Sequence, residues 1–120
     1  MGDCILIEYK KKSYICYLDL GFETIRGKWK AVILCHLSDG AKRFLELQRI
    51  TCGVSQKVLN ESLKQLEEDE LISKKIYAEV PPKVEYSLTR KGEDLIPAIK
   101  AIEEWSEKYF CEIPNNPEYK

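Results

Sequence analysis

"RFLELQRITCGVSQKVLNESLKQL", residues 43–66, decides the fold, because it predicts two helices separated by a tight turn. Each half carries apolar residues at helical spacing. The first helix has Phe44, Leu47 and Ile50, and the second, expected over residues 55–68, has Leu59, Leu63 and Leu66 with Val58 and Ser62 beside them. The apolar stripe of the second helix is therefore expected to face a core.

The turn between these helices is TCGV. Gly53 permits a reversal of the backbone that a side chain would strain, and Val54 can fill the angle between the helices. Ser55 is placed to cap the second helix. Helix, short glycine-containing turn and helix together predict a helix-turn-helix.

The outward face of the second helix is sorted by charge. Its outward positions are Gln56, Lys57, Asn60, Glu61 and Lys64, and Glu67, Glu68, Asp69 and Glu70 follow at its end. Amides and cations near a helix start suit base edges and phosphates in a DNA major groove. The acidic end would then lie away from phosphates, at a cost of a few tenths of a kcal/mol against the helix dipole. An ordinary solvated face is the alternative interpretation.

A β-hairpin is predicted next. "LISKKIYAEV" and "KVEYSLT" favour strands, and Pro81-Pro82 separates them. Helix-turn-helix followed by hairpin predicts a winged helix, mostly α with a small antiparallel β wing (α+β). Lys74, Lys75 and Lys83 lie on this wing, where they would contact a phosphate backbone. Asn60 and Lys75 are expected on the same side of the molecule.

Composition agrees with one domain. The chain has 120 residues, 44% of them hydrophobic, and a formal net charge of -1, which excludes a strongly basic nucleic-acid binder. Charge is nevertheless unevenly distributed: residues 41–64 and 72–91 each hold five basic and two acidic groups, whereas residues 93–112 hold two basic and six. We expect an N-terminal arm (1–15), the domain (16–112) and a tail (113–120).

Three further segments complete the expected fold. "ILIEYKKKSYI" is either a strand or an extended arm. Leu18, Phe22 and Ile25 share one helical face, and a second helix is expected over 28–37 before Gly40 ends it. The inward residues of that second helix are expected to be Trp29, Val32, Ile33 and Leu37.

The last helix, expected over 91–111 and bent at Pro97, has a wide apolar stripe. This stripe packs either on the first helix or, as we favour, on a second copy of the chain. The interface residues of such a homodimer would be Leu18, Phe22, Ile99, Ile102, Trp105 and Tyr109.

The order of motifs resembles the HxlR-type winged helix-turn-helix transcription regulators, over residues 16–109. The matching residues are Gly27-Lys28-Trp29, Arg43-Phe44 with Glu46-Leu47, Val54-Ser55 with Lys57 and Leu59, Pro81-Pro82 with Val84-Glu85-Tyr86 and Leu88-Thr89, and Leu95, Pro97 and Trp105. The resemblance implies a homodimer on a pseudo-palindromic double-stranded DNA site. The DNA-contacting residues would be Arg43, Ser55, Gln56, Lys57, Asn60, Lys64, Lys74, Lys75 and Lys83.

Cys16 stands at the interval from Trp29 at which the resemblance places a thiol sensor of oxidants or electrophiles, with Tyr17 where the family pattern has proline. Lys10, Lys11 and Lys12, nearby in the sequence, and a helix start would lower its pKa, whereas an inert thiol is the alternative. Cys35 and Cys52 are expected to be structural. Cys111 is a candidate for an intersubunit bridge.

No enzyme, cofactor or metal site is predicted. The chain has one histidine, His36, no glycine-rich phosphate loop and no C-x-x-C pair. Cys35 beside His36 is a poor metal pair, since adjacent helical side chains diverge. Apolar runs fall far short of the roughly 18 residues that span a bilayer, so we expect a cytoplasmic protein. A winged helix used for protein contacts is the competing hypothesis.

Overall fold

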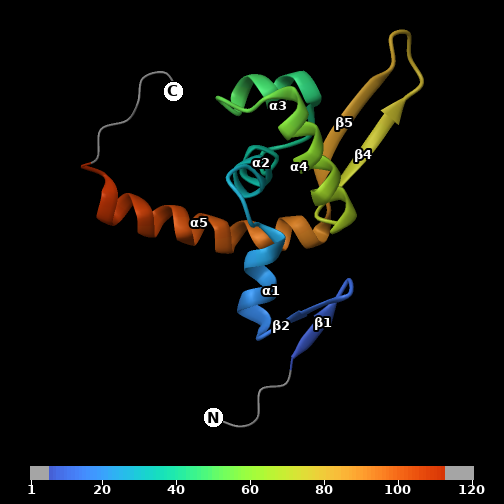
Figure 1. The fold of residues 1–120 in the computed structure, drawn as a ribbon. Helices are drawn as coiled ribbons and strands as arrows, with labels where there is room; N and C mark the ends of the chain where they lie inside the picture. Colours follow the sequence, from blue (N-terminus) through green and yellow to red (C-terminus); the bar gives the residue numbers. More distant parts are fainter. Residues whose placement is uncertain (1–5, 113–120) are drawn as a thin grey trace.

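The computed structural model describes residues 6–112 (Figure 1). The elements in chain order are β1 (Ile7–Tyr9), β2 (Lys12–Tyr14), α1 (Tyr17–Thr24), α2 (Lys30–His36), β3 (Lys42–Arg43), α3 (Phe44–Ile50), α4 (Gln56–Glu68), β4 (Ile72–Tyr77), β5 (Lys83–Leu88) and α5 (Arg90–Phe110). The expected class, mostly α with small antiparallel sheets, is confirmed.

The helix-turn-helix lies where the sequence predicted it, in α3 and α4. Gly53 has a positive φ of 90°, a backbone conformation that favours glycine. Val54 is buried beside it. The Ser55 hydroxyl accepts a hydrogen bond from the backbone N–H of Val58 at 3.1 Å, so α4 has the predicted cap.

The wing is the antiparallel pair of β4 and β5, and Figure 1 shows it projecting from the body beside α4. Its register runs from Ile72 opposite Leu88 to Tyr77 opposite Lys83. A third strand, β3, pairs with β5 on the other edge and was not predicted. Two residues are too few to show an alternating pattern, so only the pairing of Lys42 with Tyr86 and of Arg43 with Glu85 reveals this strand.

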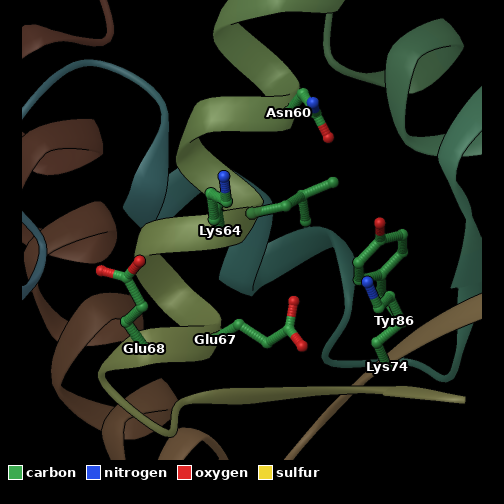
Figure 2. Close-up of a pocket in the computed structure, with 7 residues that line it drawn as sticks. Asn60, Lys64, Glu67, Glu68, Lys74 and Tyr86 are labelled. Carbon is green, nitrogen blue, oxygen red and sulfur yellow. The ribbon is translucent and has the colours of Figure 1, made fainter.

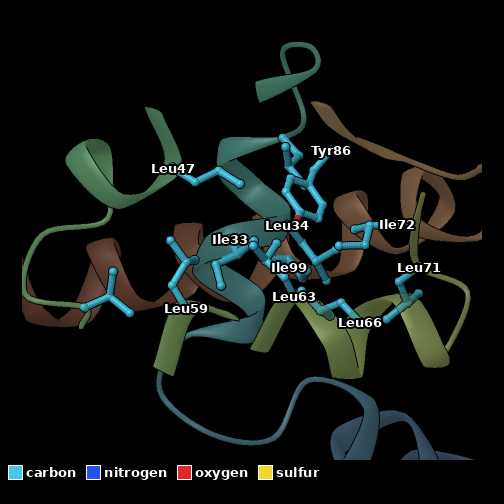
Figure 3. Close-up of a cluster of buried hydrophobic side chains, with 12 residues drawn as sticks. Ile33, Leu34, Leu47, Leu59, Leu63, Leu66, Leu71, Ile72, Tyr86 and Ile99 are labelled. Carbon is cyan, nitrogen blue, oxygen red and sulfur yellow. The ribbon is translucent and has the colours of Figure 1, made fainter. Parts of the chain in front are cut away.

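The core lies between α2, α3, α4, the wing base and the first half of α5 (Figure 3). Its buried side chains are Ile33, Leu34, Leu37, Leu47, Val54, Leu59, Leu63, Leu66, Leu71, Ile72, Tyr86 and Ile99. The predicted stripe of α4 is thus confirmed, and each fully buried leucine contributes about 2 kcal/mol.

Two details of the predicted helices are wrong. Val32 was expected inward but is 41% exposed, because α2 turns only Ile33 and Leu34 fully toward the core, with Leu37 buried just after the helix end. The helix expected over residues 28–37 is also shorter than expected, since α2 runs from Lys30 to His36. Trp29 occupies its N-cap and is half-buried.

The C-terminal helix α5 continues through Pro97 as one element of 21 residues. Ile99 was assigned to a dimer interface, but it is only 7% exposed and packs in the core of its own chain. The other five residues of the expected interface are uncovered in the single chain. Their exposed fractions are Leu18 67%, Phe22 54%, Ile102 48%, Trp105 57% and Tyr109 62%.

Candidate nucleic-acid interface

The start of α4 presents a polar face to solvent. Gln56, Lys57, Asn60 and Lys64 are exposed, while Leu59 and Leu63 on the opposite face are buried. The hydrogen bond from the Val58 N–H to the Ser55 hydroxyl fixes where α4 begins after the turn. Backbone N–H groups and the positive end of the helix dipole add to the charge of Lys57 here, so this end attracts anions.

A groove joins α4 to the wing. It has a volume of about 370 Å³, and Figure 2 shows its walls. The lining residues are Asn60, Leu63, Lys64, Glu67, Glu68, Lys74 and Tyr86. Two of the predicted helix residues, Asn60 and Lys64, and one of the predicted wing lysines, Lys74, therefore share one surface.

Tyr86 is a groove residue that the sequence analysis named in the family motif but did not assign to the DNA-contacting set. Burial raises the pKa of its phenol, with Glu67 nearby as a second cause. The hydroxyl therefore stays protonated and can donate a hydrogen bond at the base of the groove. The structure places Tyr86 opposite Lys74 in the strand register, whereas from the sequence an aromatic residue in a β-run is expected to be core.

The three wing lysines do not share a face, contrary to the expectation. Successive side chains of a strand point to opposite faces, so Lys74 faces the groove with Tyr86 whereas Lys75 and Lys83 point away from it. Their ammonium groups lie 4.9 and 4.8 Å from the centre of the Tyr77 ring. Lys74, not Lys75, is therefore the wing partner of Asn60 in the groove.

The outer face of the wing carries its own polar cluster. Lys83 lies 3.6 Å from the Glu85 carboxylate. A hydrogen bond from Tyr77 is the main cause that lowers the pKa of Glu85, and the charges of Lys83 and Arg43 lower it further. Part of the positive charge on this face is thereby neutralised within the protein.

A second open hollow, of about 600 Å³, surrounds the start of α4 and is lined by Phe44, Gln56, Lys57 and Asn60. Phe44 adds an apolar surface, which suits a thymine methyl group, and its role was not predicted. Arg43 precedes it in β3, where its backbone N–H donates to the Glu46 carboxylate at 3.0 Å and its side chain is exposed.

Comparison with known proteins supports this geometry. A family model described as HxlR-like helix-turn-helix matches residues 24–114. The chain belongs to this family. An uncharacterized HTH-type transcriptional regulator of Methanothermobacter thermautotrophicus is 41% identical over 106 residues, which cover 88% of this chain and 81% of that protein.

The solved structures of two regulators are similar to this chain. The redox regulator HypR in its oxidized form has a TM-score of 0.74 and 41% identity, covering 78% of this chain and 96% of that chain. The reduced form of the transcriptional regulator YodB from Bacillus subtilis has a TM-score of 0.70 and 34% identity, covering 82% and 96%. The names of these three relatives of the HxlR-like chain are those of regulators and not of enzymes.

The acidic end of α4 differs from the expectation. Glu67 and Glu68 line the lower end of the groove rather than lying apart from it. The expected conflict with the helix dipole is also offset, because Lys10 and Lys91 donate to the backbone carbonyls of Glu68 and Asp69. Neither lysine is near this helix in sequence.

The cysteines separate by exposure. Cys16 is exposed at the N-cap of α1, and Cys111 is exposed at the end of α5. Lys10 and Lys12, expected to act on the Cys16 thiol, instead pair with Asp69 and Glu23. Cys35 is half-buried, and burial raises the pKa of its thiol, as expected of a structural cysteine. Cys52 is half-buried in the turn before α4.

Residues 6–112 include no group of three or more His, Cys, Asp or Glu side chains that could hold a metal ion. Over the same described range, every helix is too short or too polar to cross a bilayer.

Proposed function

We propose that this HxlR-like protein binds double-stranded DNA as a homodimer at a pseudo-palindromic site and regulates transcription there. The observation that carries the proposal is the shared groove of Asn60, Lys64 and Lys74. It places an amide-bearing helix face beside a wing lysine, so one surface carries both groups that suit base edges and a group that suits phosphates.

The residues divide into base-reading and phosphate-binding groups. Gln56 and Asn60 carry amides, which pair with adenine edges in the major groove. Lys57, Lys64 and Arg43 are the cations around the same helix start and would contact phosphates. On the wing, Lys74 would contact the flanking backbone from inside the groove, while Lys75 and Lys83 would act from its outer face.

A homodimer would bury the apolar faces that one chain leaves exposed. Leu18 and Phe22 on α1 and Trp105 and Tyr109 on α5 supply large side chains that rarely stay in water as a group. Twofold symmetry would also place two copies of α4 about 34 Å apart, one helical turn of DNA. We place this regulator in the cytoplasm, where its DNA lies.

The test is affinity for fragments selected from the source genome, measured by fluorescence anisotropy over a range of salt concentrations. Lys57→Ala should weaken binding about tenfold and lower the slope of log K against log salt by about 1, because one phosphate contact is lost. Asn60→Ala should relax the preference at one base pair, where discrimination is worth about 1–3 kcal/mol.

Lys100→Ala is the matched control, since Lys100 is exposed on α5 and belongs to neither hollow. It should leave both affinity and salt slope unchanged. A winged helix used for protein contacts would show no salt-dependent DNA affinity, and the Lys57→Ala and Lys100→Ala proteins would not differ in DNA binding. That outcome would replace DNA binding with the alternative.

We further propose that Cys16 senses thiol-reactive compounds. Its exposure at the start of α1 and the likeness of the chain to the redox regulator HypR support this. The Cys16 thiol would give up its S–H proton to water and add through Sγ to an electrophilic C=C bond, whose π electrons take up a proton from water at the neighbouring atom. This adduct would change DNA affinity. Cys16→Ser should abolish that response, and Cys111→Ser, the other exposed cysteine, should keep it. If Cys16→Ser responds as the unaltered protein does, the sensor is elsewhere.

A further inference from the structure

The N-terminal hairpin of β1 and β2 precedes the segment that matches the HxlR-like family model. Its two-residue turn is Lys10-Lys11, with φ of 49° and 65°. Both residues are left-handed, the conformation of a type I′ turn, which usually selects Asn-Gly because other side chains are strained there. Lys10, the first residue of this strained turn, makes a contact with a residue far away in the sequence, Glu68.

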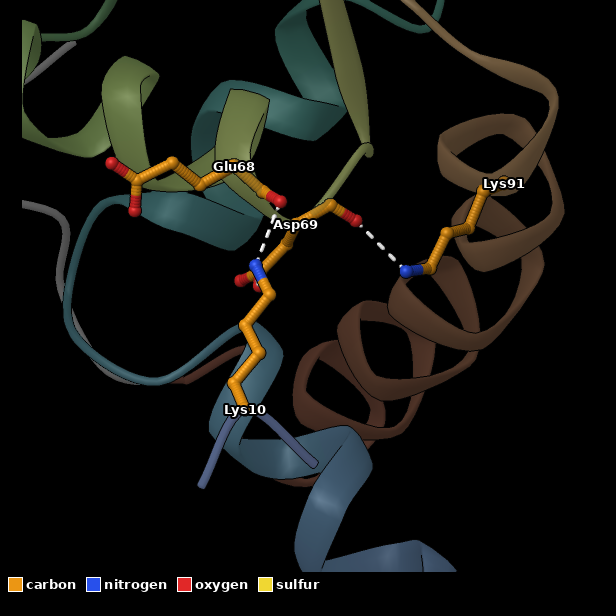
Figure 4. A network of polar contacts seen from close by, with 4 residues as sticks. All are labelled: Lys10, Glu68, Asp69 and Lys91. Atoms are coloured by element: carbon orange, nitrogen blue, oxygen red, sulfur yellow. Dashed lines mark hydrogen bonds and ion pairs between the residues drawn. The ribbon is translucent and has the colours of Figure 1, made fainter. Parts of the chain in front are cut away.

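That contact is with the end of α4 (Figure 4). The Lys10 ammonium donates to the Glu68 carbonyl at 2.7 Å and to an Asp69 carboxylate oxygen at 3.0 Å. Lys91, from the first turn of α5, donates to the Asp69 carbonyl at 2.8 Å. The last carbonyls of a helix lack partners within it, and cations there also oppose the negative end of the dipole.

Tyr9 connects the two lysines. Its ring centre lies 5.4 Å from the Lys10 ammonium and 5.9 Å from that of Lys91, within the range of cation–π attraction. A hollow of about 180 Å³ otherwise separates the hairpin from the side of α4 at Gln65. The hairpin therefore holds the helix through its turn rather than by apolar packing along its length.

We infer that Lys10 is a positioning residue for DNA binding: the N-terminal hairpin, through Lys10, fixes the end of α4 and thereby the direction of its base-reading start. The inference rests on the proposed function. A helix of 13 residues is about 20 Å long, so a 5° tilt at one end moves the other by about 1.7 Å. Such a shift breaks hydrogen bonds to base edges, which tolerate only a few tenths of an ångström.

Lys10→Met and Lys11→Met form a matched pair. Both remove one charge from the same turn, but within the described residues Lys11 has no hydrogen bond or ion pair. Lys10→Met should weaken binding of the selected fragment about threefold to tenfold, and Lys11→Met less than twofold. The salt slope should stay unchanged in both, because neither lysine is placed on a phosphate.

Hydrogen exchange supplies a readout that does not need DNA. The amides of Asp69, Glu70 and Leu71 should exchange faster in Lys10→Met than in Lys11→Met, because the end of α4 loses its anchor. Asp69→Asn leaves the hydrogen bond from Lys10 to the Glu68 carbonyl in place, so it should weaken DNA binding less than Lys10→Met does. Combining the two substitutions should weaken binding little more than Lys10→Met alone.

Equal affinities of Lys10→Met and Lys11→Met would overturn the inference, as would a salt slope that falls by about 1 in Lys10→Met, which would mark a direct phosphate contact. If the unaltered protein binds no genomic fragment, the proposed function fails instead. The exchange comparison would still report whether the hairpin holds α4.

Discussion

Gly92→Ala should destabilise the protein strongly although alanine favours helices. Gly92 is buried in the first turn of α5, where a Cβ atom would collide with the Leu71 carbonyl oxygen and lie 3.2 Å from Cδ2 of Leu88. The carbonyl has no freedom to withdraw, since it accepts the Thr89 N–H at 3.1 Å and the Leu71 side chain is in the core. The substitution must therefore displace α5 or break that hydrogen bond.

The expected magnitude follows from these contacts. Forcing an extra carbon into a packed site costs about 1–3 kcal/mol. Moving the first turn also disturbs the Thr89 cap, whose hydroxyl accepts the Gly92 N–H at 3.1 Å and is worth about 1 kcal/mol. The better helix propensity of alanine returns about 1 kcal/mol. The last two contributions cancel, so we expect a net loss of about 1–3 kcal/mol.

Urea unfolding followed by circular dichroism measures this loss, together with a fall in Tm of about 10 °C. Gly21→Ala is the sign-reversed control: Gly21 lies in α1 with nothing within 4 Å of an added Cβ, so it should gain about 0.5–1 kcal/mol. A Gly92→Ala protein as stable as the unaltered one would refute the close approach of α5 to Leu71.

Four further outcomes are expected in the same assay. Thr51→Val should raise stability by about 1 kcal/mol, because the buried Thr51 hydroxyl has no partner among the described residues; a loss would reveal one. Glu70→Gly should raise the free energy of unfolding by about 1 kcal/mol, because Glu70 has a φ of 60° that glycine adopts without strain. An unchanged free energy of unfolding would show that the backbone at Glu70 is not strained. Ser55→Ala should cost about 1 kcal/mol and fray the start of α4, seen as faster amide exchange there. Burial lowers the pKa of His36, so the unfolded chain takes up the proton first and stability should fall as pH drops from 7.5 to 5.5; His36→Gln should flatten that fall, and an unchanged slope would assign it to another group.

The local elements were predictable from the sequence. The apolar spacing of α4, the capping position of Ser55 and the turn at Gly53 each depend on neighbours within one or two helical turns, so the backbone period determines them. The same holds for the wing, whose two strands and proline-containing tip are continuous in sequence. The candidate base-reading face followed directly, because an amphipathic helix with one buried stripe leaves only the opposite positions to solvent.

The long-range pairings were not predictable. β3 is a strand only because Lys42 and Arg43 pair with Tyr86 and Glu85. The sequence shows that Lys74 and Lys75 point to opposite faces of their strand, but not which of the two faces α4. The partner of Asp69 is Lys10, 59 residues earlier. The sequence alone therefore determined the helices, the turn and the polar face, since these obey local geometry. Only the tertiary structure decided which distant charges meet, because that depends on how the whole chain closes around its core.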